Sequence, residues 1–377
     1  MTTLAMIALV LALVPALLWT VNMWLFHAPG PATPKETADP PGISVLIPAR
    51  HEEDRLGPTL ESVRANDGID LEIIVYDDHS TDGTAELVRD HARSDNRVRL
   101  MKGGDLPDGW CGKQHACWEL SQAARHDILC FIDADVRLSE DALRRIAGEL
   151  KQSRSQLISG FPRQETKSFG EKLLISFIPY ILLGFLPIWF MRRFNHPGLA
   201  AGCGQLMIAE RDAYREVGGH SAIRQSRHDG ITLPAAFRRN GYHTDLFDAK
   251  DIAVARMYDG FRSTWNGLAK NATEGMARPE ALPVFTVLLL GGQVLPAVLL
   301  PLALLVDGGC TTTLYAGAGV LLSSLPRLSG VLRFGQSALS ALLHPIGVMV
   351  LMANQWFAFL RSLLGGSAEW RGRTYDG

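Results

Sequence analysis

The sequence lacks the charge balance and cysteine spacing that would point to a nucleic-acid partner or a disulfide framework. Its 37 Lys and Arg residues face 39 Asp and Glu residues, and the formal net charge is −2. No basic field is therefore available to hold a polyanion. The five cysteines form no C-x-x-C pair and no even framework, which is typical of a reduced compartment. We expect no nucleic acid among its partners.

Two glycine-rich phosphate-binding patterns are also missing. No G-x-G-x-x-G follows the first predicted strand, and G-x-x-x-x-G-K-[ST] occurs nowhere in the chain. These absences argue against a dinucleotide oxidoreductase and against a P-loop NTPase. A diphosphate bound by this protein would instead need a divalent cation held by carboxylates.

Long apolar runs are present at both ends of the sequence. Residues 4–26 form a run of 23 residues without a charge, which as a helix would be about 35 Å long and could cross a hydrocarbon core of about 30 Å. Further spans are predicted at 282–306, at 314–325, which is marginal in length, and at 338–360. The chain is therefore predicted to be a multi-pass protein of the cell membrane.

The apolar runs divide the chain into five predicted segments. A cluster of prolines after the first run indicates an extended, semi-rigid linker. The segments are a transmembrane anchor at 1–27, the Pro-rich linker at 28–42, a soluble domain at 43–280, C-terminal transmembrane helices at 281–361 and a tail at 362–377.

The soluble domain contains one more apolar stretch, 173–191, which is long enough to cross a membrane. A crossing there would place acidic clusters that belong to one site on opposite sides of the bilayer. We therefore predict that 172–193 is an interfacial or re-entrant segment, with a buried pair of helices as the alternative. Either arrangement would bring a lipid acceptor close to the site.

Strand and helix patterns alternate through the first half of the soluble domain. This alternation predicts an α/β fold with a mostly parallel sheet, which binds ligands at the carboxyl ends of its strands. The predicted strands are 43–49, 71–76, 97–101 and 128–132, and the predicted helices are 55–65, 84–93 and 112–125.

Acidic residues follow three of the predicted strands. Glu52 and Glu53 follow the first, Asp77 and Asp78 end the second, and a D-x-D pattern at 133–135 follows the fourth. Alone, each cluster could be turn or cap chemistry. Together at one sheet edge they would repel one another unless a cation offset the charge. They favour a site for Mg²⁺ or Mn²⁺ and a diphosphate, and Lys113 at a predicted helix start could also face phosphate oxygens.

These patterns resemble glycosyltransferase family 2, the inverting enzymes of GT-A fold. The resemblance rests on IPARHEE (47–53), DDHSTDGT (77–84), DADV (133–136) and the GCGQL segment at 202–206. GWCGKQHAC (109–117), ARMYDGFRSTWNGLAKNATEG (255–275) and EWRGRTY (369–375) are more narrowly similar to membrane glycosyltransferases acting on carotenoid acids, the diaponeurosporenoate glycosyltransferases, and more distantly to hopanoid-associated glycosyltransferases.

The resemblance implies a role for each matching residue. Asp229 falls where the family keeps its catalytic base, although the family's Glu-Asp pair reads His228-Asp229 here. Asp135 would ligate the metal on the diphosphate, and Asp78 would contact the uracil. The nucleotide side would comprise Pro48, Glu52, Glu53, Asp78, Lys113 and Asp133, and the acceptor and sugar side Gly204, Gln205, His228 and Trp265.

Inverting sugar transfer requires the same groups, a carboxylate base and a metal ion. One carboxylate removes the proton of an attacking hydroxyl, and a metal offsets the charge that grows on the departing nucleoside diphosphate. We expect a transferase that moves a sugar, a UDP-hexose by the resemblance, to a lipid or isoprenoid acceptor. The active site would be cytoplasmic, because sugar nucleotides are found there.

Two alternatives remain open from the sequence. A processive polysaccharide synthase would normally carry Gln-x-x-Arg-Trp, whereas the chain has Arg262-Ser263-Thr264-Trp265, so Trp265 could cover a sugar or simply pack in a core. A catalytically silent lipid- or sugar-binding protein would not need Asp78, Asp135 and Asp229 together. A single-transfer enzyme is favoured.

Overall fold

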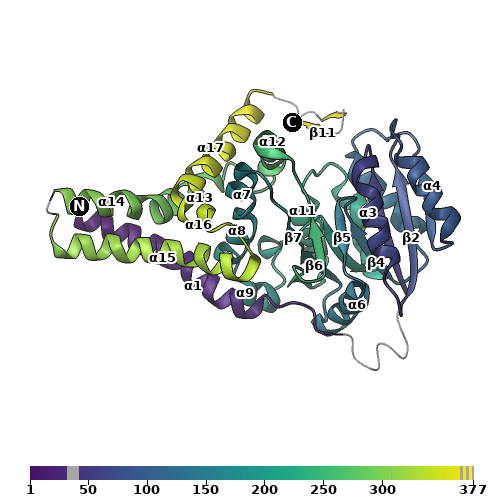
Figure 1. Ribbon diagram of the computed structural model, residues 1–377, viewed down its shortest axis with the longest axis horizontal. Coiled ribbons are helices and arrows are strands. Elements are labelled where there is room, and N and C mark those ends of the chain that lie inside the picture. The colour runs from purple at the N-terminus through teal and green to yellow at the C-terminus, as the bar shows by residue number, and fades with distance from the viewer. Residues whose placement is uncertain (32–41, 307, 366–367, 371–372, 376–377) are drawn as a thin grey trace.

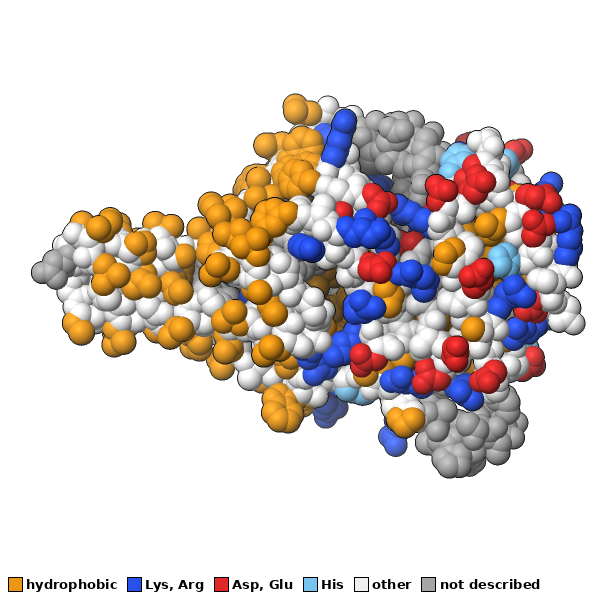
Figure 2. All heavy atoms as spheres, in the orientation of Figure 1, with side chains coloured by type: hydrophobic (Ala, Val, Ile, Leu, Met, Phe, Trp, Pro, Cys, Tyr) orange, Lys and Arg blue, Asp and Glu red, His pale blue; other side chains and the backbone are white. Residues whose placement is uncertain are grey.

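The computed structural model describes residues 1–31, 42–306, 308–365, 368–370 and 373–375. An α/β domain forms one end of the molecule, and a bundle of long helices projects from it as a stalk (Figure 1). Side chains on the stalk surface are mainly apolar, whereas the α/β domain carries most of the charged side chains (Figure 2). The linker predicted at 28–42 lies largely outside the described residues.

A seven-stranded sheet forms the centre of the α/β domain, in the order β3-β2-β1-β4-β8-β6-β9. Every neighbouring pair is parallel except the two that involve β8. The prediction of a mostly parallel sheet is therefore confirmed. The strands are β1 (Gly42–Ala49), β2 (Asp70–Asp77), β3 (Val98–Lys102), β4 (Ile128–Ile132), β6 (Leu157–Phe161), β8 (Leu206–Glu210) and β9 (Thr244–Asp248).

Helices cover both faces of this sheet, because successive side chains along a strand point to opposite faces. Val45 and Ile47 of β1 face one apolar core, and Leu46 faces the other. The first core is closed by α3 (Glu53–Arg64), α4 (Thr84–Ser94) and α6 (Ala142–Ser153), and the second by α5 (Gly112–Ala123), α10 (Arg211–Val217) and α11 (Asp229–Arg239).

Smaller elements extend the domain beyond the main sheet. A second sheet has the order β5-β10-β7, and α12 (Gly260–Ala272) follows it along the chain. The strands of this sheet are β5 (Val136–Leu138), β7 (Arg163–Gln164) and β10 (Ala253–Ala255), two 3-10 turns are η1 (Pro197–Leu199) and η2 (Gly219–Ile223), and a hairpin near the end of the chain pairs β11 (Ala368–Trp370) with β12 (Arg373–Tyr375).

Three described helical segments are long and apolar enough to cross a membrane: Thr2–Leu25, Leu282–Leu305 and His344–Leu363. The first is α1, and the last is α17. The middle one comprises α13 (Leu282–Leu289), the π-helical turn η3 (Leu290–Val294) and α14 (Leu295–Leu305). They match three of the four predicted spans.

The fourth predicted span, 314–325, lies within α15 (Cys310–Phe334). This helix is 25 residues long, so its length is not marginal, yet it is not among the three apolar segments above. It contains the buried Ser323 and the buried Arg327, and polar side chains of this kind lower its hydropathy. The number of spans therefore stays a prediction. A short helix, α16 (Ala338–Leu342), joins α15 to α17.

The apolar stretch 173–191 does not form a spanning helix. It is divided among α7 (Phe169–Ile175), α8 (Phe177–Phe185) and α9 (Ile188–Arg193), and we call 169–193 the wedge. The wedge packs between the α/β domain and the stalk, in one apolar cluster with Trp19 of α1 and Val348 of α17. The Asn22 amide donates to the carbonyls of Leu183 and Leu186, at 2.8 and 2.6 Å, which satisfies carbonyls at the end of α8.

Candidate active site

The carboxyl ends of β1 and β2 are held together by backbone and side-chain hydrogen bonds. Asp77 is paired in register with Ala49, and the Asp78 amide donates to the Ala49 carbonyl at 2.9 Å. The Glu53 carboxylate accepts from the Gly83 amide at 2.9 Å. Glu52 donates its amide to Thr84 Oγ1, also at 2.9 Å. The first two predicted acidic clusters therefore share one sheet edge.

Asp78 is buried at this edge beside an arginine that the sequence reasoning did not single out. Arg50 Nη1 lies 3.9 Å from Asp78 Oδ1 and donates to the Asp78 carbonyl at 2.6 Å. The Asp78 side chain is thus fixed next to a cation, and Pro48 lies near the end of β1, the strand that Arg50 directly follows. Glu53, by contrast, uses its carboxylate to hold the 82–84 loop.

Lys113 joins the remaining predicted residues into one cluster. Its ammonium lies 2.7 Å from Asp133 Oδ1 and 2.9 Å from Asp229 Oδ2, and it donates to the Gly204 carbonyl at 3.1 Å. These partners come from the loop after β4, the first turn of α11 and the loop before β8. The structure therefore brings together segments that lie far apart in the sequence. We call Lys113, Asp133, Asp229 and Gly204 the Lys113 cluster.

Charge and burial set the protonation of this cluster. Burial raises the pKa of Asp133, and the nearby Asp229 raises it further, against the opposing effect of Lys113. Burial also acts to raise the pKa of Asp229, but the Lys113 ammonium more than offsets this, and the pKa lies below its ordinary value. The two carboxylates hold the pKa of Lys113 well above its usual value despite burial. Asp229 is therefore ionised at neutral pH.

Asp135, two residues beyond Asp133, has a buried oxygen that lacks a partner. Its Oδ1 makes no hydrogen bond to any residue that the structure describes. Burial, and then the charges of Asp133 and Glu52, raise its pKa to about 7. A buried carboxylate oxygen near other acids is stabilised by a cation. Within the described ranges no three His, Cys, Asp or Glu residues gather to hold a metal, so other ligands would have to come from the diphosphate and water.

Gly204 and Gln205 lie against the start of α11. A Cβ atom on Gly204 would come within 2.1 Å of Asp229 Oδ1, so this position needs glycine for the close approach. Gln205 is buried, and its Oε1 accepts from Gln164 Nε2 at 2.8 Å. Its Nε2 is buried without a hydrogen-bond partner in the described part of the chain.

His228 and Trp265 occupy different places. His228 immediately precedes Asp229. Burial lowers the pKa of His228, and the charge of Asp229 acts in the opposite direction. The Trp265 ring packs between Phe261 and Phe357, with centroids 5.9 Å away from each. Its contacts thus lie between α12 and α17 rather than in the Lys113 cluster, and they favour the packing alternative for this tryptophan.

Two polar residues near the cluster were not singled out from the sequence. Lys270 is mostly buried, and burial, with Lys113 as a further cause, lowers its pKa. The Glu274 carboxylate accepts from the Arg227 amide at 2.7 Å and from the Ser226 hydroxyl, so it orders the turn before Asp229. Both lie in the segment 255–275, whose subfamily pattern was the only signal for them.

Comparison with known proteins agrees with this geometry. Residues 44–218 match the family model described as glycosyl transferase family 2. The chain is 26% identical over 351 residues to the 4,4'-diaponeurosporenoate glycosyltransferase of Staphylococcus aureus strain USA300, covering 89% of this chain and 88% of that protein. The corresponding protein of strain MRSA252 is 27% identical over 347 residues, with the same coverage.

Among solved structures, the chain resembles a mannosyltransferase from Pyrobaculum calidifontis, determined in complex with GDP-Man and Mn²⁺. The TM-score is 0.55 at 18% sequence identity, and the match covers 96% of this chain and 99% of the other. At this identity the likeness concerns the fold. Residues 44–218 therefore form a glycosyl transferase family 2 domain within a GT-A type fold, and the protein is a glycosyltransferase.

Proposed function

We propose that this glycosyltransferase moves a hexose from a UDP-sugar to a lipid or isoprenoid acceptor, with inversion at the anomeric carbon. One observation carries the proposal: Lys113 bridges Asp133 and Asp229 at 2.7 and 2.9 Å. Asp133, which we expect on the donor side, and Asp229, the expected base, therefore contact the same ammonium. The donor sugar and the attacking oxygen would meet at this point.

The nucleoside would lie at the ends of β1 and β2. Asp78 offers a fixed hydrogen-bond acceptor there and Arg50 a fixed donor. Glu52 lies close enough for its charge to raise the pKa of Asp135. Asp133 would contact the ribose. The solved mannosyltransferase of similar fold holds a nucleotide sugar, GDP-Man, which supports a nucleotide-sugar donor; the choice of uracil rests on the resemblance at Asp78.

Asp135 Oδ1, which has no hydrogen-bond partner in the described part of the chain, fits a divalent cation such as Mg²⁺ or Mn²⁺. When bound, the ion would neutralise charge on the departing diphosphate. Mn²⁺ in the similar mannosyltransferase structure supports this assignment. The resemblance assigns the metal to Asp135, and the contact of Asp133 with the Lys113 ammonium at 2.7 Å is consistent with that choice.

Asp229 would act as the general base. Because its pKa lies below the ordinary value, it is charged and ready to accept a proton from an acceptor hydroxyl. The hydroxyl oxygen attacks the anomeric carbon, the carbon–oxygen bond to the diphosphate breaks with its electron pair leaving on the nucleoside diphosphate, and the proton goes to Asp229. An acceptor that already carries a charged oxygen, such as a carboxylate, would not require this proton transfer.

The membrane setting supports a lipid acceptor. Three described helical segments could cross a bilayer, and the wedge places apolar side chains next to the α/β domain. The relatives at 26–27% identity are named for 4,4'-diaponeurosporenoate, an isoprenoid acid. We infer a multi-pass protein of the cell membrane, with its α/β domain in the cytoplasm where nucleotide sugars are available.

Mass spectrometry of lipid extracts tests this function. Cells with and without the gene are compared, and purified protein is supplied with UDP-glucose or GDP-mannose and Mn²⁺. We expect a lipid heavier by one hexose that depends on the gene and on a UDP-sugar. Long polymer from labelled donor, or absence of any sugar-bearing lipid, would contradict the proposal.

A further inference from the structure

The turn immediately before Asp229 is held by a carboxylate from a later part of the chain. Glu274 accepts a hydrogen bond from the Arg227 amide at 2.7 Å and another from the His228 amide at 3.3 Å. The Ser226 hydroxyl donates to the same carboxylate. An ionised carboxylate has acceptor sites for all three donors. Glu274 therefore fixes the backbone of the turn that leads into the first residue of α11.

This turn, residues 226–228, is held from two sides, and we call it the base turn. On one side Gln114 Nε2 of α5 donates to the Ser226 carbonyl at 3.0 Å. On the other side lies Glu274, two residues beyond the end of α12. Because Asp229 directly follows the base turn, a small displacement of the turn would move its carboxylate relative to a bound donor. Misplacing a reacting group by about 1 Å can lower a rate ~100-fold.

The segment that carries Glu274 packs closely against α17. Ala269, Ala272 and Ala277, which lie on both sides of Glu274 in the sequence, form a buried cluster with Ala358 of α17. Small side chains at a contact of this kind let two backbones approach closely. A larger side chain at Ala358 would therefore displace the end of α12. The position of Glu274 thus depends on α17.

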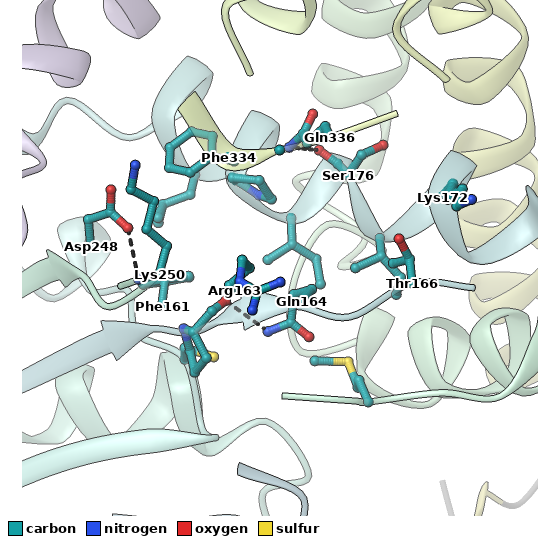
Figure 3. A pocket seen from close by; sticks show the side chains of 18 of the residues that line it. Phe161, Arg163, Gln164, Thr166, Lys172, Ser176, Asp248, Lys250, Phe334 and Gln336 are labelled. Carbon is teal, nitrogen blue, oxygen red and sulfur yellow. Dashed lines mark hydrogen bonds between the residues drawn. The ribbon is translucent and has the colours of Figure 1, made fainter. Parts of the chain in front are cut away.

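Two further contacts fix the rest of α12. Asn354 Nδ2 of α17 donates to the Trp265 carbonyl at 2.8 Å. At the start of the helix, the Gly260 amide donates to the Glu171 carboxylate of the wedge at 2.7 Å. Met257, three residues before the helix, lines the pocket that Figure 3 shows from close by, where the wedge meets the α/β domain. The wedge and α17 therefore hold α12 along its length.

We propose that Glu274 is a positioning residue for the base Asp229, and that packing of α17 against the end of α12 sets its position. The segment that forms α17 is long and apolar enough to cross a membrane. This inference rests on the proposed role of Asp229 and adds a dependence of the catalytic step on a membrane helix. Within the described part of the chain, the side-chain contacts of Glu274 are with the base turn, so it acts through Asp229.

Glu274→Gln tests the carboxylate itself. A glutamine offers one acceptor oxygen, and its amide nitrogen would face N–H and O–H donors. We expect kcat to fall ~10-fold or more, while the KM for the UDP-sugar and the binding of UDP with Mn²⁺ stay within about threefold, because the base turn is misplaced and the donor site is not. Glu280→Gln, at an exposed position of the same segment, is the matched control. A wild-type kcat in Glu274→Gln would overturn the proposal.

Ala358→Leu tests the link to α17. The larger side chain should lower kcat as Glu274→Gln does and leave UDP binding unchanged, which also shows that the variant is folded. The double variant should lose little more activity than either single variant, since both changes act through the base turn. Ala353→Leu, the same change at an exposed position of α17, should behave like wild type. Additive losses in the double variant would refute the link.

Hydrogen–deuterium exchange of the full chain in detergent micelles tests the positioning without any transfer. Peptides that cover the base turn should exchange faster in Glu274→Gln and Ala358→Leu than in wild type and the two controls, because the Arg227 and His228 amides lose their acceptor. Unchanged exchange in both variants would overturn the proposal. Failure of the wild type to transfer sugar from a UDP donor would contradict the proposed function instead, and the exchange result would still decide this inference.

Discussion

The ammonium of Lys113 lies 2.9 Å from the carboxylate of Asp229, although 116 positions separate the two residues along the chain. The same ammonium reaches Asp133 at 2.7 Å. One cation therefore stabilises two carboxylates, the buried Asp229 and the partly buried Asp133, that would otherwise repel each other. The arrangement keeps the proposed base charged and holds the 204 loop against α11.

Replacing Lys113 tests whether this ion pair is needed for transfer. In Lys113→Met we expect sugar transfer to fall ~100-fold or more, comparable to loss of one preorganised charge in an active site, because Asp133 and Asp229 lose their shared cation. Transfer is measured with radiolabelled donor. Lys151→Met should retain wild-type activity, and a Lys113→Met enzyme that transfers sugar normally would show that the bridge is dispensable.

Two carboxylates should separate donor binding from catalysis. Asp135→Ala should abolish transfer and also weaken donor binding in the presence of Mn²⁺, since the diphosphate would lose its metal. Asp229→Ala should abolish transfer to a hydroxyl acceptor and leave donor affinity within about threefold, because a general base acts on the acceptor. Calorimetry with UDP and Mn²⁺ measures both. Weaker donor binding in the Asp229 variant would contradict the assigned roles.

Adding one methyl group at Gly204 tests whether transfer depends on the close approach of the 204 loop to Asp229. In Gly204→Ala the added methyl would come within 2.1 Å of Asp229 Oδ1, so either the carboxylate or the loop must move. We expect transfer to fall ~100-fold, in line with the cost of a small misplacement of a reacting group, with little change in expression. Gly104→Ala is the matched control, since nothing lies within 4 Å of its Cβ position. Steady-state kinetics measure the transfer rate of both variants, and equal rates would contradict the prediction.

The wedge should show a pH-dependent contribution from Glu171. Burial acts to raise its pKa, but hydrogen bonds from the Lys167 amide, the Ser168 hydroxyl and the Gly260 amide more than offset this and lower it to about 2. A carboxylate whose folded pKa is depressed stabilises the fold above its unfolded value, here 4.5. That contribution is lost as the pH falls from about 4.5 toward 2.

Melting temperatures of Glu171→Gln check this linkage. At pH 7 the variant should lose about 1–3 kcal/mol of stability, seen as a lower melting temperature by scanning fluorimetry. The difference from wild type should shrink as the pH is lowered below 4.5. Glu61→Gln, at an exposed position of α3, should melt like wild type throughout. A constant difference between pH 7 and pH 3 would refute the role of the charge.

Trp265 distinguishes packing from sugar recognition. Because its ring lies between Phe261 and Phe357, we expect Trp265→Phe to keep transfer within about threefold and Trp265→Ala to lower the melting temperature by removing buried aromatic area. Donor and acceptor KM values should stay near wild type in Trp265→Phe. A large rise in either KM would instead indicate that Trp265 contacts a sugar.

The sequence alone determined much of the donor half of the protein. Strand and helix periodicity between 43 and 132 was sufficient to place the first four strands, because a buried parallel strand must be apolar and its helices amphipathic. The acidic residues at the ends of β1, β2 and β4 could be expected at one edge for the same reason. The motif resemblance, confirmed by the family match over 44–218, supplied the fold and the enzyme class.

Only the tertiary structure decided how the distant parts meet. No local pattern indicates that Lys113 would pair with Asp229, or that Arg50 would stand beside Asp78, because ion pairs across a fold depend on chain crossings that periodicity does not encode. Hydropathy gave 173–191 the length of a membrane span, yet the structure divides it into short helices, with Pro187 at the break between α8 and α9, and packs them with Trp19 and Val348.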